Sequence, residues 1–470
     1  MFKKIALGLL ALLLVGVGFA YVSYGSVGRA GSGYAAKNLC SGYFLSGFPL
    51  DVIQEEALVG ASDLLANISY TLDEDNRRVT TRFFGLFERT AVFTPGVGCT
   101  LIPPGEETSS IEVQALPALP RAADKPWPQG TAPVATNAAV QSIIDTGFVE
   151  DDPAGPLNTK AIAVVHKGEL IAERYAPGVT AQTPLLGWSM SKSVTALLVG
   201  LLVQDGKLEV MAPADVPQWQ ETPDDPRAAI TLDQLMRMSS GLEFVETYSA
   251  ATDVTQMLSL ESDAAGFAAS KPLEFAPDTN WSYSSGTTNI ISGIVRRATG
   301  GSVQEAYAYS QNRLFRPLQI ATATIEPDPS GTFIGSSYTY ASARDWARLG
   351  QLVLQDGVWE GERLLPKGWV DYLTTPTKTA SWNLYGAQVW LNRDPDDPER
   401  GRLFPALPPD AYYFGGFQGQ IVLVIPSADL VITRFGFTPA ENTKIEDIAA
   451  QIIAELASGA DASEEFAEAA

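Results

Sequence analysis

The sequence predicts an α/β (α+β) domain, an antiparallel sheet flanked by helices with an all-helical subdomain inserted, preceded by a small β-rich domain. A helix over 138–147 leads into a hairpin over 161–175 that turns at Lys167-Gly168. Apolar residues at helical spacing then dominate 230–357. A second hairpin over 420–437 and an amphipathic helix ending near 457 close the pattern. This order places the first and last hairpins in one sheet, with the helical stretch as an insert.

Composition narrows the class of protein. The 470 residues are 46% hydrophobic and 18% charged, which is typical of a globular chain with room for two or three domains. The net charge of −22 would repel phosphates and argues against a nucleic-acid partner. We interpret the acidic surface as hydrated, without a specific cationic partner.

The first 25 residues have the pattern of an export signal. Two lysines, Lys3 and Lys4, precede eighteen uncharged residues over 5–22, enough for a signal peptide or one membrane anchor. No small-residue cleavage site follows at once, so we favour an uncleaved anchor. The positive flank places the body outside the cytoplasm, on the periplasmic side of a bacterial inner membrane.

The region between this segment and the main domain divides into three parts. Residues 26–45 are rich in Gly, Ser and Ala and are interpreted as a linker. Short β-like runs over 46–103 predict a β-rich domain, so that 26–103 forms one N-terminal unit. Cys40 and Cys99 are an even pair in an exported chain, which favours one disulfide over two free thiols. Prolines over 104–135 predict an extended linker, and the small, acidic tail over 458–470 is predicted to be disordered.

The candidate catalytic residues are Ser189 and Lys192, in GWSMSKSVTALLVGLLVQD over 187–205. Apolar residues at a spacing of three and four predict a helix that begins near Ser189, which places Lys192 on the same face. A serine hydroxyl becomes a nucleophile when a neighbouring base takes its proton. A lysine can be that base in its neutral form, which burial favours. Backbone N–H groups at the helix start can stabilise an oxyanion.

The single histidine excludes other hydrolase classes. Catalytic zinc sites require two or three histidines or a set of cysteines, so His166 alone cannot form one. A Ser-His-Asp triad would have to use His166, which lies beside the turn of the first hairpin. No Gly-x-Ser-x-Gly elbow occurs. The lysine is the base that remains.

Residues 136–457 resemble the serine β-lactamase and penicillin-recognising superfamily, in particular its class C-like esterase and 6-aminohexanoate-dimer hydrolase branch. Three motifs carry the resemblance: Ser189-Met190-Ser191-Lys192, Tyr283-Ser284-Ser285, and Phe414-Gly415-Gly416 followed by Phe417. The resemblance implies a β-lactamase-like fold and no metal or organic cofactor.

The resemblance also implies roles for these residues. Ser189 attacks an ester or amide carbonyl with Lys192 as base, Tyr283 relays a proton to the leaving group, and water releases the acyl-enzyme. The backbone N–H groups of Ser189 and Phe417 form the oxyanion hole. Substrate-binding positions are Ser285, Phe414, Gly415, Gly416, Tyr248 and Trp390, and Glu246 is expected to line the cleft near Tyr248.

The sequence therefore predicts an exported or membrane-anchored serine hydrolase of small ester or amide substrates. One alternative is a β-lactamase or D-Ala-D-Ala peptidase. Phe414 counts against it, since the family's common Lys or His at this place could hold a substrate carboxylate. A second alternative is a non-catalytic sensor domain, against which the intact Ser189, Lys192 and Tyr283 count. The particular substrate and the oligomeric state do not follow from the sequence.

Overall fold

The computed structural model describes residues 25–468 apart from 121, 123, 133, 152, 154, 250–251, 382–383, 393–401 and 440–442, with side chains as far as Ser458. The segment 1–25, predicted as a signal peptide or anchor, lies outside this range except for Gly25. Among the helices of the described part, none is long and apolar enough to cross a membrane.

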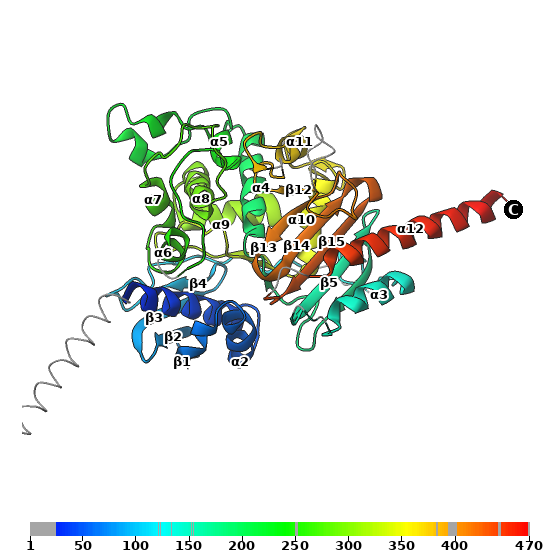
Figure 1. Cartoon of the computed structure of the whole chain (residues 1–470), viewed down its shortest axis with the longest axis horizontal. Helices are drawn as coiled ribbons and strands as arrows, with labels where there is room; N and C mark the ends of the chain where they lie inside the picture. The colour runs from blue at the N-terminus through cyan, green and yellow to red at the C-terminus, as the bar shows by residue number, and fades with distance from the viewer. Residues whose placement is uncertain are drawn as a thin grey trace, which may run out of the picture.

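A six-stranded antiparallel sheet forms the centre of the main domain, residues 136–457. Its strand order is β12-β13-β14-β15-β5-β6, so strands from both ends of the domain pair at β15 and β5. Figure 1 shows the strands side by side with helices on both faces. The strands are β5 (Thr159–His166), β6 (Glu169–Tyr175), β12 (Trp390–Leu391), β13 (Tyr412–Gly416), β14 (Gln420–Ile425) and β15 (Leu430–Gly436).

Alternating side chains of the sheet supply two separate cores. Val422, Val424 and Val431 face the core that includes α4 (Met190–Gln204) and α10 (Ala343–Leu354). Leu423 and Ile432, one residue along each strand, face α3 (Ala138–Asp145) and α12 (Ile445–Glu468). Successive side chains of a strand point to opposite faces of the sheet. Since both sets of side chains are buried under helices, both faces of this sheet are covered.

The helical insert lies between α4 and α10 and packs against α4 through α8. The first helix of this stretch, α5, is short and ends at Met236, because Arg237 has left the helical conformation and Met238 takes a positive φ of +59°. The helices are α5 (Leu232–Met236), α6 (Asp253–Ser259), α7 (Ala264–Ala269), α8 (Ser285–Thr299) and α9 (Val303–Ser310), and α11 (Trp369–Thr374) follows α10. The short strands here are β7 (Leu185–Leu186), β8 (Thr324–Ile325), β9 (Thr339–Ala341), β10 (Val358–Trp359) and β11 (Glu362–Arg363).

Residues 25–103 form a unit that we call the N-terminal module. It consists of a helix over 25–44, the short helix α2 (Leu50–Val52) with a π-helical continuation (Ile53–Val59), a 3-10 turn (Asp63–Asn67), and a four-stranded antiparallel sheet. The strands are β1 (Ile68–Asp73), β2 (Arg78–Phe83), β3 (Leu86–Thr94) and β4 (Gly98–Leu101). Cys40 of the helix and Cys99 of β4 are joined by a disulfide bond.

The interpretation of 26–45 as a linker is wrong. Residues 25–44 are helical and mostly buried. The glycines that suggested a linker are positions of close packing: a Cβ on Gly28 would lie 2.3 Å from the Phe87 ring, and one on Gly33 would lie 2.5 Å from the carbonyl oxygen of Ser259. The helix therefore uses small residues to approach both its own sheet and the main domain.

Two further expectations differ from the structure. The tail after Ser458 is not disordered, since α12 continues to Glu468 and extends beyond the sheet (Figure 1), as its alanine and glutamate content permits. The proline-rich stretch over 104–135 is extended but not free. Trp127 is 2% exposed and its indole N–H donates to the carbonyl of Arg344 at 3.2 Å, which ties this stretch to the main domain.

A buried ion pair joins the N-terminal module to the main domain. Lys37 and Glu326 are 2% and 0% exposed, with 2.7 Å between their charged atoms. The Glu326 carboxylate also accepts from the hydroxyl of Ser41 at 2.8 Å and the N–H of Cys99 at 2.6 Å. The Lys37 ammonium donates to the Cys99 carbonyl and lies 4.8 Å from the centre of the Tyr338 ring. Burial lowers the pKa of Lys37 and raises that of Glu326, while their mutual attraction opposes both shifts.

We expect Lys37→Met to destabilise the protein by about 3–5 kcal/mol, because it leaves the Glu326 carboxylate buried without its counter-charge. Urea unfolding of the oxidised protein, followed by tryptophan fluorescence, measures the change. Arg82→Met is the matched control, since its partner Glu88 is 54% exposed and surface pairs contribute little. Equal midpoints for the two variants would contradict the role assigned to the pair.

Candidate active site

The predicted nucleophile lies where a turn enters α4. Ser189 is the N-cap residue of this helix and is partly exposed, whereas Lys192, one turn on, is 1% exposed. Trp188 precedes them with φ +47°, a left-handed backbone conformation that is unfavourable for a bulky residue. Such strained residues concentrate at functional sites and persist only where their surroundings hold them.

Aromatic contacts hold Trp188 in place. Its ring lies parallel to that of Tyr34 from the N-terminal helix, with 6.0 Å between centroids. Tyr338 lies at 5.8 Å and Phe417 at 5.7 Å, edge to face. Contacts of this geometry stabilise aromatic pairs beyond the area they bury. The residue beside the nucleophile is therefore supported from both the main domain and the N-terminal module.

The ammonium of Lys192 has an acceptor for each of its three protons. It donates to the hydroxyl of Ser189 at 3.1 Å, to the hydroxyl of Ser285 at 3.0 Å and to the carbonyl of Ser336 at 3.2 Å. These acceptors come from the start of α4, the start of α8 and the loop before β9. A buried charge is tolerated when its hydrogen bonds are satisfied in this way. The arrangement holds the amine within reach of the Ser189 proton.

A carboxylate extends this network beyond the first two motifs. Glu246 accepts from the hydroxyl of Ser285 at 2.6 Å and from its backbone N–H at 2.7 Å. Burial raises the pKa of Glu246, and the ammonium of Lys192 acts in the opposite direction. Glu246 therefore fixes the rotamer of Ser285 and adds a negative charge near Lys192. The sequence places it only at the rim of the cleft, since its partner Ser285 is distant in the chain.

Tyr283 lies over the same ammonium. Its ring centroid is 4.6 Å from the Lys192 amine, and the ring also contacts Trp390 at 5.3 Å and Tyr385 at 5.8 Å. The structure thus brings Ser189, Lys192 and Tyr283 together, with Trp390 beside Tyr283. This aromatic cluster forms one wall of the site.

Tyr248 lies on another side of the site. Its ring is 52% exposed and stacks on Phe417 at 6.2 Å, with 7° between the planes. The hydroxyl is the buried end of the Tyr248 side chain and lies near the charge of Glu246. Burial of this hydroxyl, next to the charge of Glu246, raises the pKa of Tyr248 well above its usual range.

The third motif forms the end of β13. Gly416 approaches the turn before Ser189 so closely that a Cβ would lie 2.2 Å from the carbonyl oxygen of Gly187. Glycine is therefore required for packing at this position, and this contact brings Phe417 next to the nucleophile's turn. Gly415 is partly exposed and faces Trp390, since a Cβ added to it would lie 3.2 Å from the indole ring.

The prediction that Phe414 contacts the substrate is wrong. Its side chain is 0% exposed and belongs to the core between the sheet and α4. Strand alternation explains this, because the side chain of Phe414 lies on the helix-covered face of β13. An apolar ring at this position stabilises the core and offers no surface or charge to a ligand.

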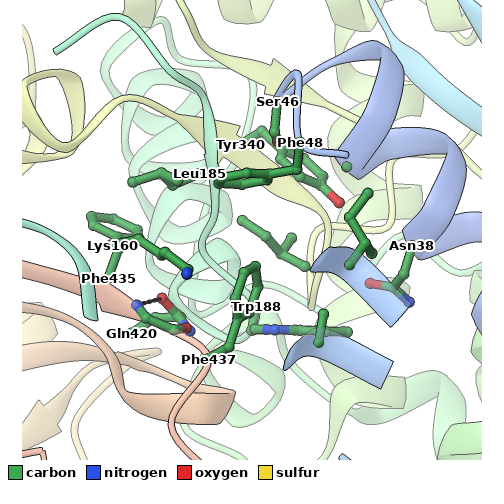
Figure 2. A pocket seen from close by; sticks show the side chains of 15 residues that line it. Asn38, Ser46, Phe48, Lys160, Leu185, Trp188, Tyr340, Gln420, Phe435 and Phe437 are labelled. Carbon is green, nitrogen blue, oxygen red and sulfur yellow. Dashed lines mark hydrogen bonds between the residues drawn. The ribbon is translucent and has the colours of Figure 1, made fainter. Parts of the chain in front are cut away.

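A small cavity beside Trp188 lies between the N-terminal module and the main domain (Figure 2). Asn38, Ser46 and Phe48 line it from one side, and Lys160 and Trp188 from the other. Its volume of about 30 Å³ accommodates one or two waters. This cavity is a packing gap at the interface and is too small for a substrate.

Comparisons with known proteins agree with this geometry. Residues 152–454 match the family model described as Beta-lactamase. A 6-aminohexanoate-dimer hydrolase of Paenarthrobacter ureafaciens is 25% identical over 314 residues, which cover 61% of this chain and 74% of that relative.

Solved structures share the fold at lower identity. A family VIII carboxylesterase superposes with a TM-score of 0.51 at 14% identity, covering 68% of this chain and 98% of that one. A penicillin-binding protein homologue from Caulobacter crescentus gives a TM-score of 0.50 at 16% identity, covering 69% and 98%. These likenesses show the fold, and the N-terminal module lies outside the matched family region.

We expect Glu246→Gln to slow the reaction of Ser189 with a fluorophosphonate at least tenfold. The side-chain amide that replaces the carboxylate has one acceptor oxygen in place of two, so one of the two hydrogen bonds from Ser285 is lost. The substitution also removes the negative charge near Lys192. A time course of intact mass measures the labelling rate. Glu243→Gln, three residues earlier and exposed, is the matched control and should label as the wild type does. A labelling rate for Glu246→Gln within twofold of wild type would show that Glu246 does not contribute to the reactivity of Ser189.

Proposed function

Since this chain belongs to the beta-lactamase family and is a serine hydrolase, we propose that it cleaves small ester or amide substrates through an acyl-enzyme on Ser189. The observation that carries the proposal is the 3.1 Å contact between the amine of Lys192 and the hydroxyl of Ser189, inside a buried network. A serine with such a partner is activated for nucleophilic attack.

The proposed reaction uses residues from three motifs. The reactive form of Lys192 carries one proton fewer than the ammonium described above, and this neutral amine takes the proton of the Ser189 hydroxyl as the serine oxygen attacks the substrate carbonyl. The backbone N–H groups of Ser189 and Phe417 stabilise the oxyanion that develops. Tyr283 passes a proton to the leaving alcohol or amine, and water then attacks the acyl-enzyme by the reverse sequence. Ser285 and Glu246 hold Lys192 in place through both halves of the reaction.

The substrate class follows from two arguments. The relative from Paenarthrobacter ureafaciens is named for the hydrolysis of an amide-linked dimer, which supports an amide or a more reactive ester here. Phe414 replaces the family's common Lys or His in the third motif, and as a buried apolar ring it supplies no cation to hold a substrate carboxylate. This favours substrates without a carboxylate at that position over β-lactams and D-Ala-D-Ala peptides.

We also infer that the chain is exported to the periplasmic side of a bacterial inner membrane, through the segment 1–25. The lysines before the apolar run and the Cys40–Cys99 disulfide support this location, because disulfides persist in oxidising compartments.

Fractionation of expressing cells tests the export proposal. Wild type should appear in the periplasmic or membrane fraction with both cysteines protected from alkylation. Leu9→Arg with Leu13→Arg should retain the protein in the cytoplasm, since two charges break the apolar run. Cytoplasmic wild-type protein with two alkylatable thiols would contradict the proposal.

Hydrolysis of 4-nitrophenyl acetate and of simple amides tests the catalytic proposal. Ser189→Ala and Lys192→Ala should each lower kcat/KM by at least about a thousandfold, and the double variant should be no worse, because residues of one catalytic unit are not additive. Lys207→Ala, an exposed lysine just past the same helix, should match wild type. Activity of Ser189→Ala within tenfold of wild type would overturn the assignment of Ser189 as nucleophile. β-Lactams are included in the same screen, and a preference for them over esters and amides would favour the β-lactamase alternative.

A further inference from the structure

A second, larger cavity lies beside the active site, between the N-terminal module and the helical insert. Its volume of about 370 Å³ falls in the range of small-molecule pockets. The N-terminal helix contributes Val27, Ala30 and Gly31, and the 3-10 turn that follows contributes Leu64. Its lining is mainly apolar.

Two active-site residues form the opposite wall. Phe417 and Tyr248 both line the cavity, and their rings stack on each other at 6.2 Å. Phe417 is the residue whose backbone N–H is assigned to the oxyanion hole, and its ring also contacts Trp188, next to the nucleophile. Tyr248 follows Glu246 by two residues, and Glu246 accepts a hydrogen bond from Ser285 of the Lys192 network. The cavity therefore borders the catalytic site at Phe417 and Tyr248.

The rim of this cavity exposes unusually large apolar side chains. Leu64, Tyr248 and Phe417 are 58%, 52% and 46% exposed. Contiguous exposed apolar surface on a folded protein marks a binding site more often than chance placement does. The rim residues come from both the N-terminal module and the main domain, so neither part alone builds the site.

We propose that this cavity binds an alkyl chain attached to the scissile carbonyl group, and that the N-terminal module thereby determines substrate specificity. The inference rests on the proposed function, since it names the substrate class of that same site: esters or amides with an apolar chain. The alkyl chain is part either of the substrate's acyl group or of its alcohol or amine. In both cases the cavity recognises the same apolar chemistry.

Gly31 provides a direct way to fill the cavity. It lies inside the N-terminal helix, and a Cβ there would meet Leu65 at 3.6 Å and Phe83 at 3.8 Å, which are ordinary contacts. Gly31→Ala adds one methyl group and Gly31→Leu occupies more of the space. Leu64→Gln removes apolar surface at the rim without touching the core. Met211→Ala, at a residue that is 65% exposed and does not line the cavity, is the control.

The experiment measures kcat/KM for 4-nitrophenyl alkanoates from acetate to octanoate, and for acetates of alcohols from ethanol to octanol. We expect wild type to gain about three- to fourfold per methylene in one series, which identifies the side that carries the chain. Gly31→Leu should lower the octanoate-to-acetate ratio, or the corresponding alcohol ratio, at least tenfold. Gly31→Ala should give a smaller loss, Leu64→Gln should flatten the series, and Met211→Ala should leave the ratios unchanged.

Fluorophosphonate labelling of Ser189 separates the two proposals. Labelling and acetate turnover without any chain-length preference, or with a preference that Gly31→Leu and Leu64→Gln do not change, overturn the cavity's role and leave the catalytic proposal standing. No labelling and no turnover of any ester overturns both. If Gly31→Leu does not fold, the Leu64→Gln series decides.

Discussion

The buried ammonium of Lys192 is the constraint on which the rest of the active site depends. Three protons of a nearly unexposed amine require three acceptors, and two of these come from segments more than 90 residues away in the chain. Moving any of these segments would leave a buried charge without a partner, which is costly. The position of the insert, the loop before β9 and the α4 turn relative to one another is thus coupled to the hydrogen bonds of one side chain.

Around this centre, the N-terminal module packs against the turn that carries the candidate nucleophile. Tyr34 stacks on Trp188 beside the nucleophile, and Lys37 pairs with Glu326 inside the interface. The disulfide joins the helix that makes these contacts to the last strand of its own sheet. A module outside the matched family region therefore supports the strained turn and forms one wall of the larger cavity. The β-lactamase-like fold provides the chemistry, and this addition changes the surroundings of the nucleophile.

The expectations that failed share a physical cause. The Gly- and Ala-rich stretch over 26–45 suggested a linker, yet Gly28 and Gly33 are small because neighbouring groups approach them closely in a packed helix. Phe414 occupies a motif position that suggests ligand contact, yet its face of β13 is covered by α4. The expectation that Glu246 lines the cleft did not fail but named no partner, and the fold supplies Ser285 at the start of α8 within hydrogen-bond distance. In each case the local composition was compatible with two environments.

Local pattern by itself determined the hairpins over 161–175 and 420–437, the helix that begins at Ser189, and the one-turn spacing of Ser189 and Lys192. These features depend on periodicity and on neighbours within a few residues, which a sequence displays directly. The tertiary structure alone decided which acceptors satisfy the hydrogen bonds of the Lys192 amine, which residues support Trp188, and which surfaces enclose the larger cavity. Those depend on contacts between distant segments, whose geometry is set by the packing of the whole chain.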